Sequence, residues 1–260
     1  MKYLVLLLVL FSIESVAQDF SLFEKRIFVS SKGDSLPYRI LFPEGYDKAK
    51  KYPLVLFLHG GGERGTDNEK QLTHGVKLFL TPENRKNYPC IVIAPQCMVD
   101  SYWPSAKYDR TQRPLNIEFN YNNPVTKALD ATTELTKSII KTESVDKKKV
   151  YITGLSMGGM GTFEMVYRNP KLFAAAAPIC GGGDANAYSK KQTRTRYWIF
   201  HGDSDVVVEV KHSRAMNDRL QALKANVHYT EYPGVNHNSW DNAYAEPDFL
   251  AWMFNKDYKF

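Results

Sequence analysis

Short, mostly apolar runs recur along this sequence, and they set the strongest constraint on its fold. Stretches with helical periodicity lie between most of these runs. Parallel strands whose two faces are both covered by helices are apolar throughout, whereas strands with one wet face alternate. The pattern therefore predicts a mostly parallel sheet with helices on both faces. The expected strands are 54–58, 91–94, 150–153, 174–177, 198–200 and 227–232.

Four segments are expected to form the covering helices, because their apolar residues recur on one helical face. These segments are 125–141, 157–168, 208–224 and 247–254. Ahead of the parallel strands, the alternating segments 26–29 and 38–42 flank a Gly33-Asp34 turn signal and predict an antiparallel hairpin. No change of composition divides the chain, so we expect one doubly wound α/β domain.

The N-terminus has the pattern of a secretory signal peptide. Lys2 precedes the apolar run 4–11, and small residues follow up to Ala17. The run is too short to span a bilayer. We therefore expect cleavage after Ala17, a secreted or periplasmic domain of residues 18–260, and no stable membrane insertion after cleavage.

A formal net charge of +6 could indicate a polyanionic partner, but the basic residues are scattered and acidic residues lie among them. The one basic run, Lys147 to Lys149, is most simply a solvated turn. We therefore expect no nucleic-acid partner. Nor do we expect a disulfide framework, because three cysteines cannot all pair and Cys90 and Cys97 flank a strand whose ends lie roughly 20 Å apart.

The segment with the most chemical information is Gly154-Leu155-Ser156-Met157-Gly158, a G-x-S-x-G motif between an expected strand and an expected helix. A serine on so sharp a turn needs glycine on both sides because the neighbouring elements press close. The bare pattern arises by chance in on the order of one chain in ten of this size. Its position between strand and helix favours Ser156 as a nucleophile over a helix-capping serine.

A serine hydroxyl needs a base to take its proton and a carboxylate to orient that base. His237 follows the last expected strand, and Asp203 and Asp205 follow the expected strand 198–200. We predict His237 as the base, with Asp205 favoured over Asp203 as the acid. His59 and His201 are expected to be structural residues of their own loops.

The run His59-Gly60-Gly61-Gly62 follows the first buried strand and leaves backbone N–H groups for an oxyanion hole. Its second donor would be the N–H of Met157. A phosphate-binding loop is less favoured because no Lys-Ser/Thr pair follows the glycines. A plain glycine-rich turn is the remaining alternative.

The segment 98–123 is too long for a plain connection and leaves from the carboxyl end of a strand, where sites form. It either walls a substrate pocket or packs without contact to a ligand. Tyr102, Trp103 and Trp240 are candidate pocket aromatics that could stack on an aryl group or a sugar. Ordinary packing is an equal alternative for all three.

Together these residues resemble the α/β-hydrolase superfamily, and more narrowly the secreted esterases that are grouped with phospholipase/carboxylesterase and with polyhydroxybutyrate-depolymerase- or feruloyl-esterase-like proteins. The resemblance covers nearly all of residues 18–260 and rests on segments 58–65, 154–159, 178–184, 201–208 and 237–240. It implies the α/β-hydrolase fold and places the acid on Asp205 through an H-G-x-x-D-x-x-V pattern. By the same likeness, Gly61 and Met157 are the oxyanion donors of the Ser156 nucleophile, with His237 as its base.

The resemblance also implies ester hydrolysis through an acyl-enzyme, without metal or organic cofactor. The expected substrate is a small-molecule or oligosaccharide-linked ester, such as an acetyl or feruloyl ester. A secreted serine peptidase, an acyltransferase of the same fold and an inactive, hydrolase-like binding protein of the cell envelope are the alternatives.

Overall fold

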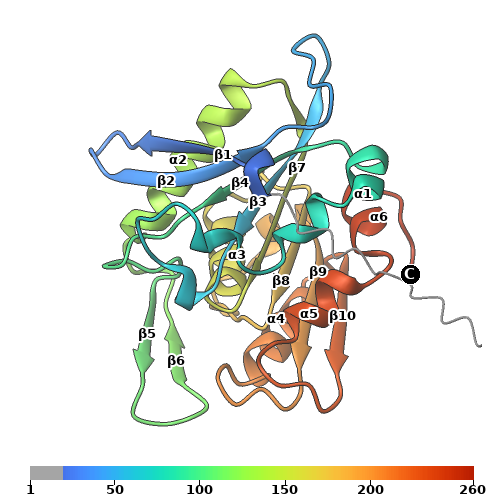
Figure 1. Ribbon diagram of the computed structural model, residues 1–260. Coiled ribbons are helices and arrows are strands. Elements are labelled where there is room, and N and C mark those ends of the chain that lie inside the picture. Colours follow the sequence, from blue (N-terminus) through green and yellow to red (C-terminus); the bar gives the residue numbers. More distant parts are fainter. Residues whose placement is uncertain (1–19) are drawn as a thin grey trace, which may run out of the picture.

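An eight-stranded sheet forms the centre of the computed structural model, which describes residues 20–260; the expected signal peptide at 1–17 lies outside them (Figure 1). The strand order is β1-β2-β4-β3-β7-β8-β9-β10. All pairs from β4 to β10 are parallel. The predicted mostly parallel sheet is therefore confirmed. Its strands are β1 (Glu24–Val29), β2 (Ser35–Leu41), β3 (Tyr52–Leu58), β4 (Ile91–Pro95), β7 (Val145–Leu155), β8 (Ala175–Ile179), β9 (Arg196–Gly202) and β10 (Val227–Tyr232).

The predicted hairpin is formed by β1 and β2, which pair in antiparallel register. Gly33 in its turn has φ +84°, a left-handed conformation that glycine adopts without a steric penalty. Strand β2 also pairs antiparallel with β4, which joins the hairpin to the parallel part of the sheet. The N-terminal segment thus extends the sheet at one edge.

Helices cover both faces of the sheet, as the apolar strands require. Leu54 and Leu56 of β3 pack in one apolar cluster with the three longest helices, whereas Val55 and Phe57 pack in a second cluster on the opposite face. The helices of the first cluster are α2 (Lys127–Thr142), α3 (Met157–Arg168) and α4 (Lys211–Ala222). Those of the second are α5 (Trp240–Ala245) and α6 (Phe249–Phe254). Within the described residues, no helix has the length and apolarity to cross a membrane.

The structure adds short elements that periodicity did not predict. The long segment 98–123 contains a two-stranded antiparallel ribbon, β5 (Ala106–Asp109) and β6 (Asn116–Phe119). Helices α1 (Pro82–Asn87) and α5 are also additions. Each of these elements has only four or six residues, too few to establish a periodic pattern.

The basic run Lys147 to Lys149 requires a correction. It is exposed, as expected, but it lies inside β7 rather than in a turn. The pairing of β3 with β7 passes from Tyr52 opposite Val145 to Leu54 opposite Val150, so the lysines occupy an irregularity in the ladder. The bulge turns these lysines to solvent.

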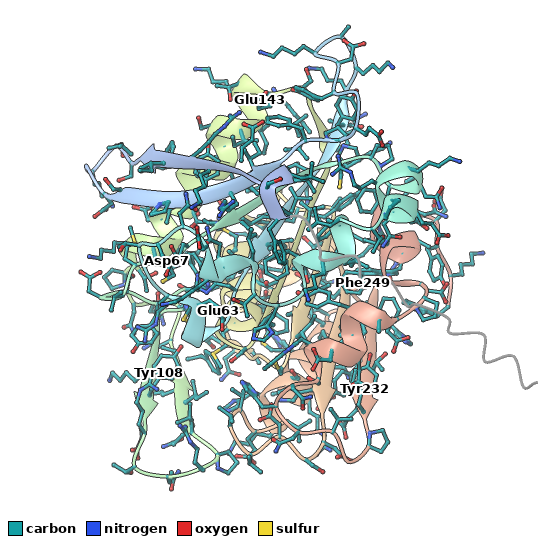
Figure 2. All side chains as sticks on the ribbon, in the orientation of Figure 1. Glu63, Asp67, Tyr108, Glu143, Tyr232 and Phe249 are labelled. Carbon is teal, nitrogen blue, oxygen red and sulfur yellow. The ribbon has the colours of Figure 1, made fainter. Side chains whose placement is uncertain are left out.

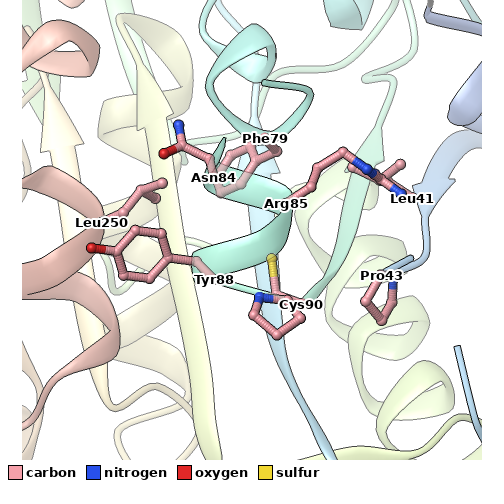
Figure 3. A pocket seen from close by; sticks show the side chains of 9 residues that line it. Leu41, Pro43, Phe79, Asn84, Arg85, Tyr88, Cys90 and Leu250 are labelled. Carbon is pink, nitrogen blue, oxygen red and sulfur yellow. The ribbon is translucent and has the colours of Figure 1, made fainter. Parts of the chain in front are cut away.

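Packing beneath α1 is almost complete. A cavity of about 10 Å³ remains there, bordered by Leu41, Phe79, Tyr88, Cys90 and Leu250 among others (Figure 3). That volume holds about one water molecule at most, so this cavity is a packing gap and not a site. Cys90, like Cys97 and Cys180, is buried with a free thiol.

Candidate active site

Ser156 lies on the sharp turn between β7 and α3. Its backbone has φ +54° and ψ −117°, a strained conformation for a residue with a side chain. Its N–H donates to the carbonyl oxygen of Ile179 at 2.9 Å, which ties the turn to β8. A Cβ on Gly158 would lie 2.0 Å from the carbonyl oxygen of Leu58, and one on Gly154 would lie 2.5 Å from that of Gly158. The two motif glycines thus permit the close packing that holds the serine in place.

Three of the predicted site residues meet in one chain of hydrogen bonds. Ser156 Oγ lies 2.9 Å from His237 Nε2, and His237 Nδ1 lies 2.7 Å from Asp205 Oδ2. The loops after β7, β9 and β10 supply these residues, and the carboxyl ends of parallel strands share one edge of a sheet. Asp203 is exposed, and its carboxylate instead accepts hydrogen bonds from Ser204 Oγ and the N–H of Gly234.

The carboxylate of Asp205 is buried but well supplied with donors. Its Oδ1 accepts the N–H groups of Val207 at 2.8 Å and Val208 at 2.9 Å. Burial raises the pKa of Asp205, but hydrogen bonds from His201, His237 and the N–H of Val208 lower it further than burial raises it. The net effect is a pKa below the ordinary range of an aspartate, so the group carries a negative charge at neutral pH.

His201 also contacts the acid, a contact that the sequence did not indicate. Its Nε2 lies 3.1 Å from Asp205 Oδ2 and 2.9 Å from the carbonyl oxygen of Val208. Both partners are acceptors, so Nε2 carries the hydrogen. Nδ1 lies 2.7 Å from Ser213 Oγ, which holds the other side of the fully buried ring. His201 lies within β9 and not in a loop, which corrects its expected place; its contacts with Val208 and Asp205 brace the loop that follows β9. The spacing of His201, near the carboxyl end of β9, and Asp205, four residues further on, is the signal that could have found this contact.

The two expected oxyanion donors lie at helix starts. Met157 is the first residue of α3, and Gly61 is the first residue of a short 3-10 helix, Gly61–Glu63. The first N–H groups of a helix have no acceptor within it, so they can face a ligand. Both residues line the same cavity as Ser156.

The neutral ring of His59 fixes the loop that carries Gly61. Its Nε2 accepts the N–H of Cys97 at 2.9 Å, and its Nδ1 donates to the carbonyl oxygen of Gly60 at 2.6 Å. Complete burial lowers the pKa of His59 to about 4. The expected structural role of His59 agrees with these contacts.

A cavity of about 250 Å³ opens above Ser156. The β5–β6 ribbon forms one wall of it and lies at the same end of the molecule as the carboxyl ends of β9 and β10 (Figure 1). Leu115 in the ribbon's connecting loop donates its N–H to the carbonyl oxygen of Val207 at 2.9 Å. The lining residues are Gly61, Gly62, Arg64, Tyr102, Tyr108, Arg110, Arg113, Leu115, Ser156, Met157, Met160, Val207 and His237.

The three candidate pocket aromatics have different positions. Tyr102 lines the cavity next to Tyr108 of β5, whose side chain Figure 2 labels. Trp103 is fully buried and donates Nε1–H to the carbonyl oxygen of His59 at 3.0 Å, so it supports the loop from behind. Trp240 lies outside the lining residues, with its ring edge-on to His237 at 5.4 Å between centroids.

A possible metal-ligand group coincides with the site. Donor atoms of Cys180, Asp205 and His237 lie within 4.8 Å of one another. Cys180 Sγ instead accepts the N–H of Ser156 at 3.2 Å, and burial raises the pKa of this thiol well above its ordinary value. His237 and Asp205 are bonded to each other. These contacts suit proton transfer from the serine better than cation binding.

Comparison with known proteins agrees with this fold. The model of the Phospholipase/Carboxylesterase family matches residues 46–246. Lysophospholipase-like protein 1 of Mus musculus is 22% identical over 212 residues, 78% of this chain and 85% of the mouse protein. A bifunctional acetylxylan esterase/xylanase of Neocallimastix patriciarum is 32% identical over 83 residues, which are 32% of this chain and 12% of that protein.

Solved structures give the same result. The crystal structure of a thermostable esterase has a TM-score of 0.81 and 37% identity; the match covers 90% of this chain and 63% of that longer chain. A ferulic acid esterase from Anaeromyces mucronatus, solved in complex with ferulic acid, has a TM-score of 0.65 and 18% identity, with 90% of this chain and 91% of that chain covered. The chain therefore belongs to the phospholipase/carboxylesterase family of α/β hydrolases, whose members and structural neighbours support its assignment as a carboxylic ester hydrolase.

Proposed function

We propose that this protein is a serine carboxylesterase in which Ser156 is the nucleophile, His237 the general base and Asp205 the residue that orients His237. The observation that carries this proposal is the chain of hydrogen bonds from Ser156 Oγ through His237 to Asp205, at 2.9 Å and 2.7 Å. Two further facts support it: Ser156 faces a cavity, and the turn that holds it is strained.

In the first half-reaction, Ser156 Oγ attacks the carbonyl carbon of the ester while its proton moves to His237 Nε2. The carbonyl oxygen becomes an oxyanion that accepts hydrogen bonds from the N–H groups of Met157 and Gly61. When the intermediate collapses, the C–O bond to the alcohol breaks and the alcohol leaves with the proton from His237. The negative Asp205 stabilises the imidazolium and keeps its Nδ1–H directed away from the ester.

In the second half-reaction, water attacks the acyl-enzyme and passes a proton to His237. Collapse of the second intermediate releases the carboxylic acid and returns the proton to Ser156 Oγ. Each cycle therefore consumes one ester and one water and yields one acid and one alcohol.

We further propose carbohydrate-linked esters, acetyl or feruloyl, as substrates. The names of two relatives support this choice, an acetylxylan esterase/xylanase and a ferulic acid esterase solved with ferulic acid. The Tyr102 and Tyr108 walls of the cavity could contact an aryl group or a sugar ring. Comparing the hydrolysis of acetylated and feruloylated oligosaccharides with that of simple alkyl acetates tests the proposal; no preference for the sugar esters would contradict it.

The proposed enzyme acts after export. We propose that residues 1–17 are a signal peptide and that residues 18–260 form the catalytic domain. Expression of the full chain in a bacterium, followed by N-terminal sequencing of the exported protein, should give Gln18 as its first residue. Recovery of only uncleaved chain from the membrane fraction would contradict the signal peptide.

The test of the catalytic serine is hydrolysis of p-nitrophenyl acetate by the protein and by Ser156→Ala. We expect kcat/KM to fall at least about 10³-fold, because the nucleophile is lost while the fold is kept. Ser138→Ala, a change of the same type on α2, is the control and should retain full activity. Circular dichroism must show that both variants are folded. Equal rates for Ser156→Ala and the unchanged protein would remove Ser156 as nucleophile.

A further inference from the structure

We propose that the active-site cavity selects esters that carry a carboxylate group, and that Arg64, Arg110 and Arg113 recognise this group. The inference rests on the proposed function, since it assigns a substrate class to the cavity that contains Ser156. The carboxylate can belong to the acyl part of the ester or to its alcohol part.

The charges in the cavity wall have one sign. Three of the lining residues are arginines, and none is Asp or Glu. Some other arginines of the protein, by contrast, are paired with carboxylates: Arg168 pairs with Glu164, and Arg214 with Glu231. Across residues 20–260, no ion pair involves any of the three cavity arginines. Their positive charge is therefore not neutralised by the protein itself.

Aromatic rings hold two of the guanidinium groups in place. The guanidinium carbon of Arg64 lies 4.3 Å from the centroid of the Tyr102 ring. That of Arg110 lies 5.8 Å from the same ring and 5.4 Å from the Tyr108 ring. Cation–π contact orients a guanidinium without cancelling its charge, unlike an ion pair. Tyr102 and Tyr108 thus fix the direction of cations that are still able to bind an anion.

Hydrogen bonds to neutral acceptors add to this positioning. Arg64 donates from Nε to the carbonyl oxygen of Gly61 at 3.1 Å and from Nη1 to that of Val99 at 2.9 Å. Arg110 donates from Nη2 to Tyr102 Oη at 3.2 Å. These acceptors carry no net charge, so the arginines keep a full positive charge and further donors for a carboxylate.

The loop with Arg110 and Arg113 is anchored beside the nucleophile. Leu115 of this loop donates its N–H to Val207, two residues after Asp205. Its side chain packs with Met160 of α3 and Val208. Arg113 is exposed and has no hydrogen bond or ion pair among the described residues, so it can turn to a ligand without losing a contact. The wall is thus fixed relative to Ser156, and one cation in it is available.

A carboxylate suits this arrangement for two reasons. Guanidinium groups bind carboxylates with two parallel, charge-assisted hydrogen bonds. A concave site with charges of one sign also focuses its field and raises the local concentration of an oppositely charged substrate. A neutral ester of the same size gains neither effect.

Two pairs of substrates separate the two positions of the carboxylate. For the acyl part, mono-p-nitrophenyl adipate is compared with p-nitrophenyl hexanoate, which has the same chain length and no charge. For the alcohol part, 4-acetoxybenzoate is compared with 4-acetoxybenzamide. The measured quantity is the ratio of kcat/KM for the charged ester to kcat/KM for its neutral partner. The intrinsic reactivity of each ester cancels when this ratio is compared between protein variants.

The variant is Arg110→Gln/Arg113→Gln, and the control Lys191→Gln/Arg194→Gln removes the same charge from an exposed 3-10 helix outside the cavity. We expect the ratio to fall at least about tenfold in the cavity variant for at least one pair, and to stay unchanged in the control. The pair that responds identifies the part of the ester that carries the carboxylate.

An unchanged ratio for both pairs in the folded cavity variant would overturn the inference. So would an equal fall in the control, because the effect would then come from net charge alone. Neither result would contradict the proposed function, which the Ser156→Ala comparison tests separately. Melting temperatures establish that both variants are folded.

Discussion

Asp205 holds two imidazole rings at once, through the same carboxylate oxygen. Oδ2 lies 2.7 Å from His237 Nδ1 and 3.1 Å from His201 Nε2, while Oδ1 is occupied by backbone N–H groups. We therefore predict that His201 is a positioning residue, which acts on His237 through Asp205. Its buried ring limits the rotation of the carboxylate and contributes to its lowered pKa.

Two substitutions of similar polarity separate this role from simple packing. The amide nitrogen of Gln reaches the position of Nε2 in histidine, whereas that of Asn reaches only the position of Nδ1. We expect His201→Asn to lower kcat on p-nitrophenyl acetate about tenfold with little change in KM, because Asp205 loses a donor. His201→Gln should retain most of kcat. Steady-state kinetics on folded proteins check this; an equal loss of kcat in both variants would assign His201 a packing role only.

At the residue scale, the sequence was informative where a role depends on a local pattern. Ser156, Asp205 and His237 each come after a strand that the sequence predicted, and strand ends of a parallel sheet meet at one edge, so their contact follows from the topology. The position of Trp103 behind the loop of His59 depends on how an irregular segment packs, and no pattern predicts that. The cavity arginines were missed for the same reason.

At the scale of elements, the approach of α3 to β3 decides whether the Ser156 turn can form. A Cβ on Gly158 would lie 2.0 Å from a backbone oxygen of β3, and backbone cannot move aside as a side-chain end can. Around Gly62, by contrast, no atom lies within 4 Å of an added Cβ. The two glycines of the site thus have opposite tolerance for a methyl group.

We expect Gly158→Ala to lower the free energy of unfolding by about 3 kcal/mol or more, since α3 must move away from the sheet. Gly62→Ala, the control, should change it by less than about 1 kcal/mol. Urea unfolding followed by fluorescence measures both values. If Gly158→Ala does not fold at all while Gly62→Ala does, this also supports the prediction, as a larger loss of stability. Equal stability of the two variants would contradict the packing argument.

The predictability of elements follows their burial. All eight strands of the central sheet were expected from apolar runs or alternation. Inner strands covered by helices require such residues, whereas the edge strand β1 is largely exposed and was found from its alternation and the turn that follows it. Helix α3 was predicted with its observed bounds, since Ser156 precedes it and Asn169-Pro170 follows it. The β5–β6 ribbon contributes one buried apolar side chain, that of Ile117, to a small cluster with Leu115, Met160 and Val208, so its sequence carries little apolar signal.

At the scale of the whole molecule, buried neutral histidines make stability depend on pH. Burial lowers the pKa of His59 to about 4, and burial together with the charge of Lys211 lowers that of His212 to about 4. In the unfolded chain both groups have the ordinary value of about 6.5. Between these two values the unfolded state binds more protons than the folded state, so stability rises with pH and is lost on acidification.

The contribution of His59 can be separated from that of other groups by choosing the pH window. Carboxylates with a lowered pKa, such as Asp205 and Glu231, lose their contribution mainly below about pH 5, where the unfolded forms begin to protonate. Between pH 7 and pH 5 the change therefore reflects histidines. Taking a folded value of about 4 for His59, its share over this window is about 2 kcal/mol.

We expect the free energy of unfolding to fall between pH 7 and pH 5, and to fall by about 2 kcal/mol less in His59→Gln. The Gln side chain can still accept the N–H of Cys97 through its amide oxygen but takes up no proton. Urea unfolding of both proteins at pH 7 gives the cost of the substitution itself, and the difference between the two pH values isolates proton binding. If both proteins lose the same stability on acidification, His59 is either protonated in the folded state or not the group that senses pH. That result would contradict a neutral His59 ring in the folded protein.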